Sequence, residues 1–356
     1  MKTLRIDYQG KMIYLGIDVH KRTYSVTVIC DGLIVKRDTI AASPVGLVTY
    51  LKRGFAGARI RSAYEAGFSG FTLHRMLVQN GVENIVINPA SIEVAANDKV
   101  KTDRRDSRKL AEQLCAGRLQ AIFVPEPEQE LRRQLTRTRE QIVRQRSRLA
   151  NQIKSKLHYF GLLGDALLDR VVNERSLKQI ESLNLGEELA FALRLLSAQW
   201  RFLTLQLTEL QQKLRVQARG DAALESTYRS APGIGPIGAR VLANELGNPA
   251  QRFHNERELF KFTGLTPTEH SSGESVRRGH ISRQGAARIR ALLVEAAWEA
   301  VRADPALRFA FERLAARCGK KRAIVAMARK LIGRIRACFK AGTLYECMPA
   351  VFTELA

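Results

Sequence analysis

The sequence is poor in acidic residues and contains no long apolar run. Its 356 residues include 35 Asp and Glu against 58 Lys and Arg, which leaves a formal net charge of +23. Charged residues interrupt every apolar stretch before it reaches the length of a bilayer span or of a signal-peptide core. We therefore expect a cytoplasmic protein that has no membrane segment.

Cysteine and histidine are also sparse. The five cysteines are an odd number, lie far apart and form no Cys-x-x-Cys pair, which excludes a disulfide framework and a zinc ribbon and favours reduced thiols. The six histidines lack metal-ligand spacing. His270 and His280, for example, have no cysteine beside them, and we interpret these two as surface residues or phosphate contacts.

The sequence does contain enough apolar residues to fold, together with a large excess of positive charge. Hydrophobic residues make up 45% of the chain, which is ordinary for a globular protein, and the length suits two or three domains. A surplus of +23 favours a polyanionic partner, because clustered Lys and Arg neutralise phosphates and release their counterions. The alternative is a basic surface that serves only solubility.

The first part of the chain, residues 1–122, has the pattern of an α/β domain. The expected elements are, in order, strands at 12–17, 24–29 and 33–35, a helix after Pro44, a strand ending near Tyr64, a helix over 71–78, a strand at 85–87 and a helix from about Asp106. Asp31 and Gly32 between the second and third strands are a two-residue hairpin signal. A hairpin followed by alternating strands and helices is the order of a ribonuclease H-like fold.

The second part, residues 123–222, is expected to be helical. Eight residues recur at alternating spacings of four and three, which makes an uninterrupted heptad seam: Leu189, Leu193, Leu196, Trp200, Leu203, Leu207, Leu210 and Leu214. An earlier helix has apolar residues seven apart at Leu135, Ile142 and Leu149. Glycines between the two helices favour an antiparallel coiled-coil arm. Because the seam has no other evident cover, we expect it to mediate self-association. The alternative is that it packs within one chain, against the helix of residues 135–157.

Positive charge is concentrated in the earlier of these two helices. Residues 131–160 contain nine Lys and Arg and one acid. Because one acid cannot neutralise nine bases, we expect this helix to follow a nucleic-acid backbone through Arg144, Arg146 and Arg148. The alternative is a solvated face of the coiled coil.

The third part, residues 223–356, is expected to be a helical domain. Residues 270–340 contain seventeen Lys and Arg against five acids and few aromatic residues, which favours duplex backbone or structured RNA over stacking on single strands. Gly233 and Gly235 begin a Gly-x-Gly-x-x-Gly run. Because we expect a helix before it, we favour a helix-hairpin-helix turn that meets a DNA phosphate over a dinucleotide site. A tight interhelical turn without DNA is the alternative.

Four acidic residues have the order of a ribonuclease H-like catalytic set. Asp18 follows the first strand, Glu65 ends a later strand, and Asp103 and Asp106 are three apart at an expected helix start, so both would face one side. Carboxylates suit Mg²⁺, and a pair of ions can stabilise the attacking and leaving oxygens of a phosphodiester displacement. We expect two Mg²⁺ ions, for which Mn²⁺ can substitute. A solvated helix start is the alternative for Asp103 and Asp106.

Several short motifs, spread over nearly the whole chain, resemble those of one protein family. They are Gly16-Ile17-Asp18-Val19-His20-Lys21, Tyr64-Glu65-Ala66-Gly67, Ile87-Asn88-Pro89, Lys101-Thr102-Asp103 with Asp106-Ser107, and the segments 231–238, 262–267 and 271–277. In this order they resemble the bacterial insertion-sequence DEDD transposases, which are described as bridge-RNA-guided recombinases with a RuvC-like N-terminal domain. One departure is Ala66-Gly67-Phe68, where the family has Ala-Thr-Gly or Ala-Cys-Gly. It leaves Glu65 in place.

The resemblance implies an enzyme that cuts and rejoins DNA. The four acids would bind the metal, and a C-terminal serine would be the nucleophile; the matching position is Ser272, with Ser271 and Ser275 as rivals. Guanidinium groups can stabilise the charge that develops on phosphorus, and three follow this serine: Arg277, Arg278 and Arg283. The family also implies a structured guide RNA, dimers that pair into tetramers on DNA, and a place at the bacterial nucleoid.

Two other functions stay open at this point. A metal-only RuvC-like nuclease of the Holliday-junction type would hydrolyse DNA with water, and a covalent protein–DNA adduct would distinguish a recombinase from it. A structural nucleic-acid-binding protein would carry the acids incidentally, and metal-dependent strand cleavage would exclude it. In the recombinase, Ser272 and the acids can meet within one chain or between two.

Overall fold

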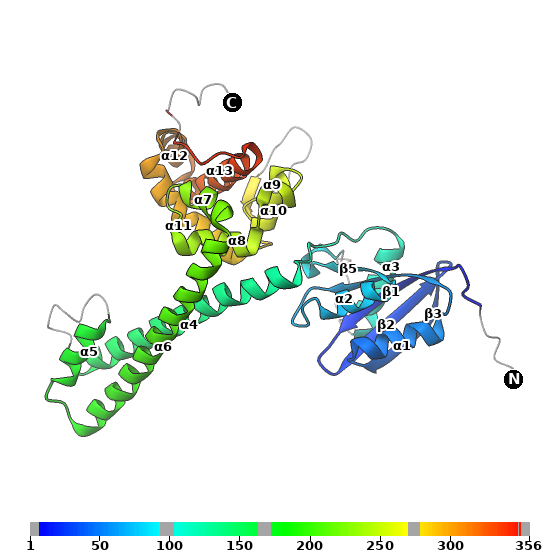
Figure 1. Cartoon of the computed structure of the whole chain (residues 1–356), viewed down its shortest axis with the longest axis horizontal. Coiled ribbons are helices and arrows are strands. Elements are labelled where there is room, and N and C mark those ends of the chain that lie inside the picture. The colour runs from blue at the N-terminus through cyan, green and yellow to red at the C-terminus, as the bar shows by residue number, and fades with distance from the viewer. Residues whose placement is uncertain (1–6, 93–102, 163–171, 270–277, 348, 350–356) are drawn as a thin grey trace. The chain divides into compact units, whose positions relative to one another are not determined.

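The computed structural model describes residues 7–92, 103–162, 172–269, 278–347 and 349. The chain forms two units, Met1–Pro125 and Glu126–Ala356. The second unit includes both the long helices of the arm and the C-terminal helices (Figure 1).

The first unit is built on a five-stranded mixed sheet. Its strands are β1 (Met12–Val19), β2 (Thr23–Cys30), β3 (Leu33–Ala41), β4 (Arg59–Glu65) and β5 (Glu83–Ile87). Their spatial order is β3-β2-β1-β4-β5. The first three strands pair antiparallel, whereas β4 runs parallel to β1 and β5 runs parallel to β4. This topology agrees with the expected ribonuclease H-like order.

The hairpin between β2 and β3 turns at the two predicted residues. Asp31 and Gly32 both have positive φ, 52° and 77°. A two-residue turn with positive φ at both positions matches the right-handed twist of the flanking strands. Asp31 also accepts a hydrogen bond from Lys11 Nζ at 2.9 Å. The turn therefore sets the register of β3 against β2.

Alternation along β1 assigns its side chains to two faces of the sheet. Ile13, Leu15 and Ile17 are fully buried in one core cluster with residues of α1 (Pro44–Gly54) and α2 (Thr72–Gln79). Gly16 points the other way, toward α3 (Asp103–Cys115). Asp18, two residues further on, shares the face of Gly16.

The helix α3 packs directly on the backbone of β1. A Cβ added at Gly16 would lie 2.1 Å from the carbonyl oxygen of Ser107 and 2.5 Å from the nitrogen of Ala111. The hydroxyls of Ser107 and Thr27 form a buried hydrogen bond of 2.9 Å between α3 and β2. The described part of α3 begins at Asp103, three residues before the expected start, so both predicted aspartates lie in its first turn.

The second unit is helical in the part that the structure describes, apart from the small hairpin of β6 (Pro267–Glu269) and β7 (Arg278–Ile281). Its helices are α4 (Pro127–Tyr159), α5 (Glu174–Glu181), α6 (Glu187–Gly220), α7 (Ala222–Ser230), α8 (Pro236–Leu246), α9 (Pro249–Arg252), α10 (Glu256–Thr263), α11 (Ala287–Ala303), α12 (Pro305–Cys318) and α13 (Lys320–Ala341). The helix α12 was not expected from the sequence. It begins at Pro305, where the Asp304 side chain accepts from the Leu307 nitrogen at 2.9 Å.

The long helices α4 and α6 lie side by side and run in opposite directions (Figure 1). Alternate residues of the α6 seam are buried: Leu193, Trp200, Leu207 and Leu214. Leu193 and Trp200 share a core cluster with Ile153 and Leu157 of α4. The seam is thus covered within its own chain. The premise that it lacks a cover is wrong, and self-association needs another argument.

The C-terminal helices share one core and are joined by a buried ion pair. The core includes Tyr228, Leu242 and Leu331. The fully buried Asp304 accepts from Arg334 Nη1 at 2.7 Å and from the Tyr345 hydroxyl at 2.8 Å, which holds the segment after α13 against the bundle. Among the described residues, no helix has both the length and the apolar character needed to cross a bilayer.

Candidate functional site

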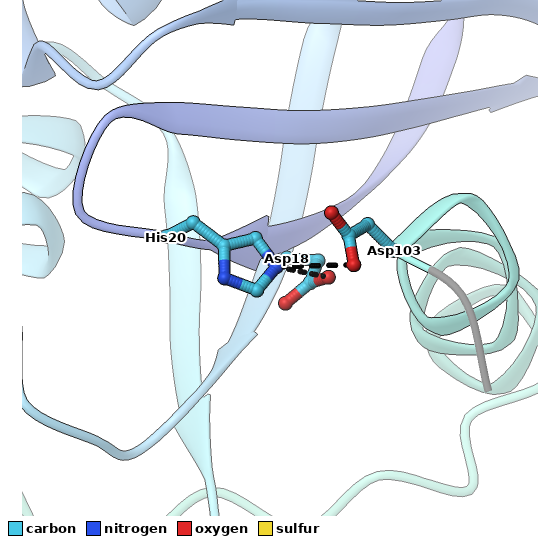
Figure 2. A group of neighbouring side chains, drawn as sticks. All are labelled: Asp18, His20 and Asp103. Carbon is cyan, nitrogen blue, oxygen red and sulfur yellow. Dashed lines mark hydrogen bonds and ion pairs between the residues drawn. The ribbon is translucent and has the colours of Figure 1, made fainter.

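Two of the four predicted acids meet beside a histidine at the end of β1. Asp18 lies on β1, His20 follows it, and Asp103 is in the first turn of α3 (Figure 2). His20 Nε2 is 3.1 Å from Asp18 Oδ2 and 3.3 Å from Asp103 Oδ1. One donor atom from each residue lies within 4.8 Å of the other two. Donors this close can ligate one divalent cation.

Glu65 and Asp106 lie on elements that border this group without contributing a donor atom to it. Ile17 of β1 pairs with Tyr64 of the parallel β4, so Asp18 and Glu65 occupy the next position on each strand. Tyr64 belongs to the core of the opposite face, and alternation therefore turns Glu65 toward the face of α3. Asp106 is one helical turn beyond Asp103.

The electrostatics of the site favour the binding of a cation. Burial raises the pKa of Asp18, and the carboxylates of Asp103 and Asp106 act in the same direction, whereas His20 opposes them. The Asp18 side chain is 21% exposed and that of Asp103 is 60% exposed. A divalent cation would relieve the repulsion among these carboxylates. The donor set therefore fits a divalent cation.

Spacings between histidines and cysteines give no signal for His20. Here the partners are a carboxylate two residues earlier and another on a distant helix. The available signal was the alternation of β1, since Asp18 and His20 at positions i and i+2 fall on one side of an extended chain.

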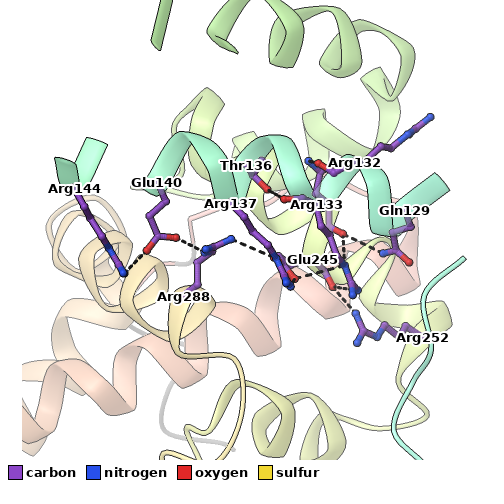
Figure 3. Close-up of polar contacts among 11 residues, drawn as sticks. Gln129, Arg132, Arg133, Thr136, Arg137, Glu140, Arg144, Glu245, Arg252 and Arg288 are labelled. Atoms are coloured by element: carbon purple, nitrogen blue, oxygen red, sulfur yellow. Dashed lines mark hydrogen bonds and ion pairs between the residues drawn. The ribbon is translucent and has the colours of Figure 1, made fainter. Parts of the chain in front are cut away.

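The basic helix α4 is only partly available to a nucleic acid. Arg137 donates to both carboxylate oxygens of Glu245 on α8, at 2.9 and 3.0 Å (Figure 3). Arg133 is buried and donates to the main-chain oxygens of Asn244 and Glu245. Arg132 pairs with Asp221 at 2.9 Å. The argument that one acid cannot neutralise nine bases is therefore wrong for this half of the helix, because the acids come from elsewhere in the fold.

The three arginines predicted to bind nucleic acid lie further along α4. Arg144 is paired with Glu140, and Arg146 stacks over the Trp200 ring at 5.5 Å, while Arg148 is exposed. A shallow hollow of about 550 Å³ follows this stretch. The residues that line it include two arginines and no acid: Val143, Arg144, Ser147, Arg148, Asn151, Gln152 and Ser155. This face of the helix suits a polyanion.

The predicted serine lies outside the described residues. Ser272, its rivals Ser271 and Ser275, and Arg277 fall in the segment 270–277 between β6 and β7. Arg278 is the first residue of β7. Arg283 is exposed and adopts a left-handed backbone with φ of 55°.

The Gly233–Gly235 turn joins two helices, α7 and α8. A helix precedes it, so the strand that a dinucleotide site requires is not there. Gly233 has φ of 78°, and a Cβ there would lie 2.4 Å from the Ala296 carbonyl oxygen of α11. Packing against α11 thus explains Gly233 without DNA. Gly235 precedes the first turn of α8 and has open space around it.

Comparison with known proteins gives two family matches and several relatives. Residues 15–160, which include the four acids, match a family described as Transposase, and residues 225–312 match one described as Transposase IS116/IS110/IS902 family. "Putative transposase y4qE" and "Putative transposase y4rJ" of Sinorhizobium fredii are each 29% identical. The alignment covers 80% of this chain and 71% of the first relative, and 96% and 95% for the second. "Transposase for insertion sequence element IS1111A" of Coxiella burnetii is 25% identical over 94% of this chain and 91% of its own.

Proposed function

The chain belongs to the IS116/IS110/IS902 family of insertion-sequence transposases, and from this premise we propose that it cuts and rejoins DNA with a metal-assisted serine nucleophile. The observation that carries the proposal is the convergence of Asp18, His20 and Asp103 at the C-terminal end of β1, the central strand of the mixed sheet. In this proposal residues 1–122 form the RuvC-like metal domain, 123–222 a coiled-coil arm and 223–356 the domain that carries the serine.

Asp18, Glu65, Asp103 and Asp106 would hold two Mg²⁺ ions, with Mn²⁺ as a substitute. When bound, such ions stabilise the attacking and the leaving oxygen of a phosphodiester displacement. The chain's own contribution is to keep the donors in place: α3 carries Asp103 and Asp106, and the packing of α3 on Gly16 sets their distance from Asp18.

Ser272 would attack the phosphorus of the scissile phosphodiester. Its Oγ–P bond forms while the bond from phosphorus to the leaving sugar oxygen breaks, the serine loses its hydroxyl proton and the leaving oxygen gains one. A hydroxyl of another strand then attacks the phosphoserine ester, which restores the serine and joins the new strand. Because the ester conserves the bond energy, rejoining needs no high-energy cofactor. Arg277, Arg278 and Arg283 would stabilise the developing charge.

The basic surfaces would bind the DNA and a structured guide RNA. Arg144 and Arg148 on α4 line a shallow hollow that contains no acid. Gly235 is the N-cap of α8 and has open space around it, so a phosphate would approach the start of this helix in a helix-hairpin-helix-like turn. We propose that the protein acts at the bacterial nucleoid as a dimer that pairs into a tetramer on DNA.

The test is covalent trapping on a nicked suicide substrate made from the junction DNA of the element. Mass spectrometry after proteolysis should find DNA on the peptide that contains Ser272. Ser272→Ala should abolish the adduct and recombination while nucleic-acid binding persists, and Ser271→Ala and Ser275→Ala are matched controls that should keep the adduct. Metal-dependent cleavage without any adduct would establish the metal-only nuclease. Binding without cleavage would leave a structural nucleic-acid-binding protein.

A further inference from the structure

We propose that His20 is a ligand of the metal ion held by Asp18 and Asp103, and that this nitrogen donor makes the site prefer Mn²⁺ to Mg²⁺. The inference rests on the proposed function, because it concerns the same site, and it adds a residue outside the four-acid set. It also predicts which metal the site selects.

The distances at His20 fit adjacent positions around one ion. Two donors about 2.1 Å from a cation and at right angles to each other are about 3.0 Å apart. His20 Nε2 lies 3.1 Å from Asp18 Oδ2 and 3.3 Å from Asp103 Oδ1. Both contacts converge on the same ring nitrogen (Figure 2). A small movement of the three side chains would admit a cation between them.

The backbone holds the imidazole in this place. The N–H of His20 donates to the Thr23 carbonyl oxygen at 3.0 Å across the turn between β1 and β2, and Asp18 is fixed by its pairing with Ser25. The His20 side chain is 46% exposed, so burial of its ring in a core does not account for its position. The open side leaves room for further ligands, such as water or a phosphate oxygen.

The chemistry of the donors gives the expected selectivity. Mg²⁺ binds oxygen ligands almost exclusively and keeps much of its water, whereas imidazole is a good ligand for first-row transition ions. A set of two carboxylates and one imidazole therefore favours Mn²⁺ over Mg²⁺ more than four carboxylates would.

A different arrangement would give the same distances without a metal. In it, the His20 ring only hydrogen-bonds to the two carboxylates and has to leave when a cation arrives. The two arrangements differ in one observable, which is whether a histidine nitrogen is bonded to the ion.

The experiment uses the full-length chain with Mn²⁺ alone. Electron spin-echo envelope modulation of the bound Mn²⁺ should show ¹⁴N coupling, which should change to the ¹⁵N pattern when the histidines are labelled with ¹⁵N. His20→Ala should abolish the coupling and weaken Mn²⁺ binding by about tenfold or more. It should also lower the Mg²⁺ concentration needed to displace half of the Mn²⁺. The matched control is His158→Ala, an exposed histidine on α4, which should retain the coupling.

Asp18→Asn separates failure of this inference from failure of the proposed site. If Mn²⁺ binding depends on Asp18 but shows no nitrogen coupling, His20 is displaced by the metal and the inference is wrong, while the carboxylate site stands. If Mn²⁺ binding does not depend on Asp18, the proposed metal site itself is wrong. Persistence of the coupling in His20→Ala would also overturn the assignment.

Discussion

Replacing Gly16 with alanine should displace the helix that carries two of the acids. The added Cβ would lie 2.1 Å from the Ser107 oxygen, 2.5 Å from the Ala111 nitrogen and 2.9 Å from the Leu110 Cβ. Two of these atoms belong to the backbone of α3, so no rotamer change can relieve the clash. Because unbonded heavy atoms normally stay about 3.5 Å apart, α3 has to move by about 1 Å.

The displacement should reduce both stability and activity. Overpacking of this kind costs about 1–3 kcal/mol in free energy of unfolding. A misplacement of about 1 Å at a catalytic site can lower the rate by about 100-fold, and here Asp103 would move relative to Asp18 while every ligand remains present. We therefore expect weaker Mn²⁺ binding and a much lower recombination rate in a protein that still folds.

The matched control is Gly54→Ala, in the same unit at the end of α1, where a Cβ would meet no atom within 4 Å. Urea denaturation gives the stability change, and Mn²⁺ titration followed by electron paramagnetic resonance gives the affinity. If Gly16→Ala binds Mn²⁺ and unfolds as the wild type does, the packing of α3 does not set the metal site.

Three further predictions concern the arm, the basic face and Asp18. Leu207→Ala should lower the free energy of unfolding by about 2–5 kcal/mol, because the Leu207 side chain is only 4% exposed. The control Leu205→Ala, on the same helix at a side chain that is 58% exposed, should change the free energy of unfolding by no more than about 0.5 kcal/mol. Urea denaturation measures both. Arg148→Glu should reduce the slope of log affinity against log salt by about one or more. The control Arg302→Glu, at an exposed arginine paired with Glu299, should leave the slope unchanged. An unchanged slope for Arg148→Glu would assign Arg148 to the solvated face of the helix. Asp18→Asn should stabilise the metal-free protein at pH 7 while abolishing metal binding, because a raised folded-state pKa means that folding disfavours the charged form. The stability difference from the wild type should narrow as the pH falls through that pKa, and a difference that widens on acidification would contradict the shift.

The acids could be located from the sequence because strand alternation is a local property. The succession of strands along the chain, the hairpin at Asp31 and Gly32, and the positions of Asp18 and Glu65 near strand ends follow from patterns a few residues long. The start of α3 was expected near Asp106, whereas Asp103 is already helical, since helix ends carry the weakest local signal. The described start at Asp103 still places Asp103 and Asp106 in the same turn.

The partners of the basic helix could not be predicted, because they are distant in the chain. Glu245 is 108 residues from Arg137, and Asp221 is 89 residues from Arg132. A charge count within residues 131–160 treats these arginines as unneutralised, whereas the fold brings acids to them. For the α6 seam, the heptad spacing and the antiparallel arrangement follow from the sequence, whereas the choice between cover by α4 of the same chain and cover by a second chain does not.

The two-residue period of an extended chain accounts both for Asp18, which was predicted as a ligand, and for His20, which was not. Gly16 and Asp18 lie at alternate positions of β1 and so share one face of the sheet, and His20, two residues beyond Asp18 and just after the strand, contacts Asp18. The glycine allows α3 to approach the strand, and α3 brings Asp103 beside Asp18 and His20. The three residues of the spacing Gly-x-Asp-x-His therefore act together: Gly16 leaves room for α3 to pack on β1, and Asp18 and His20 lie beside the Asp103 carboxylate of that helix. The signal for this site is therefore the two-residue period of an extended chain and not the spacing between histidines.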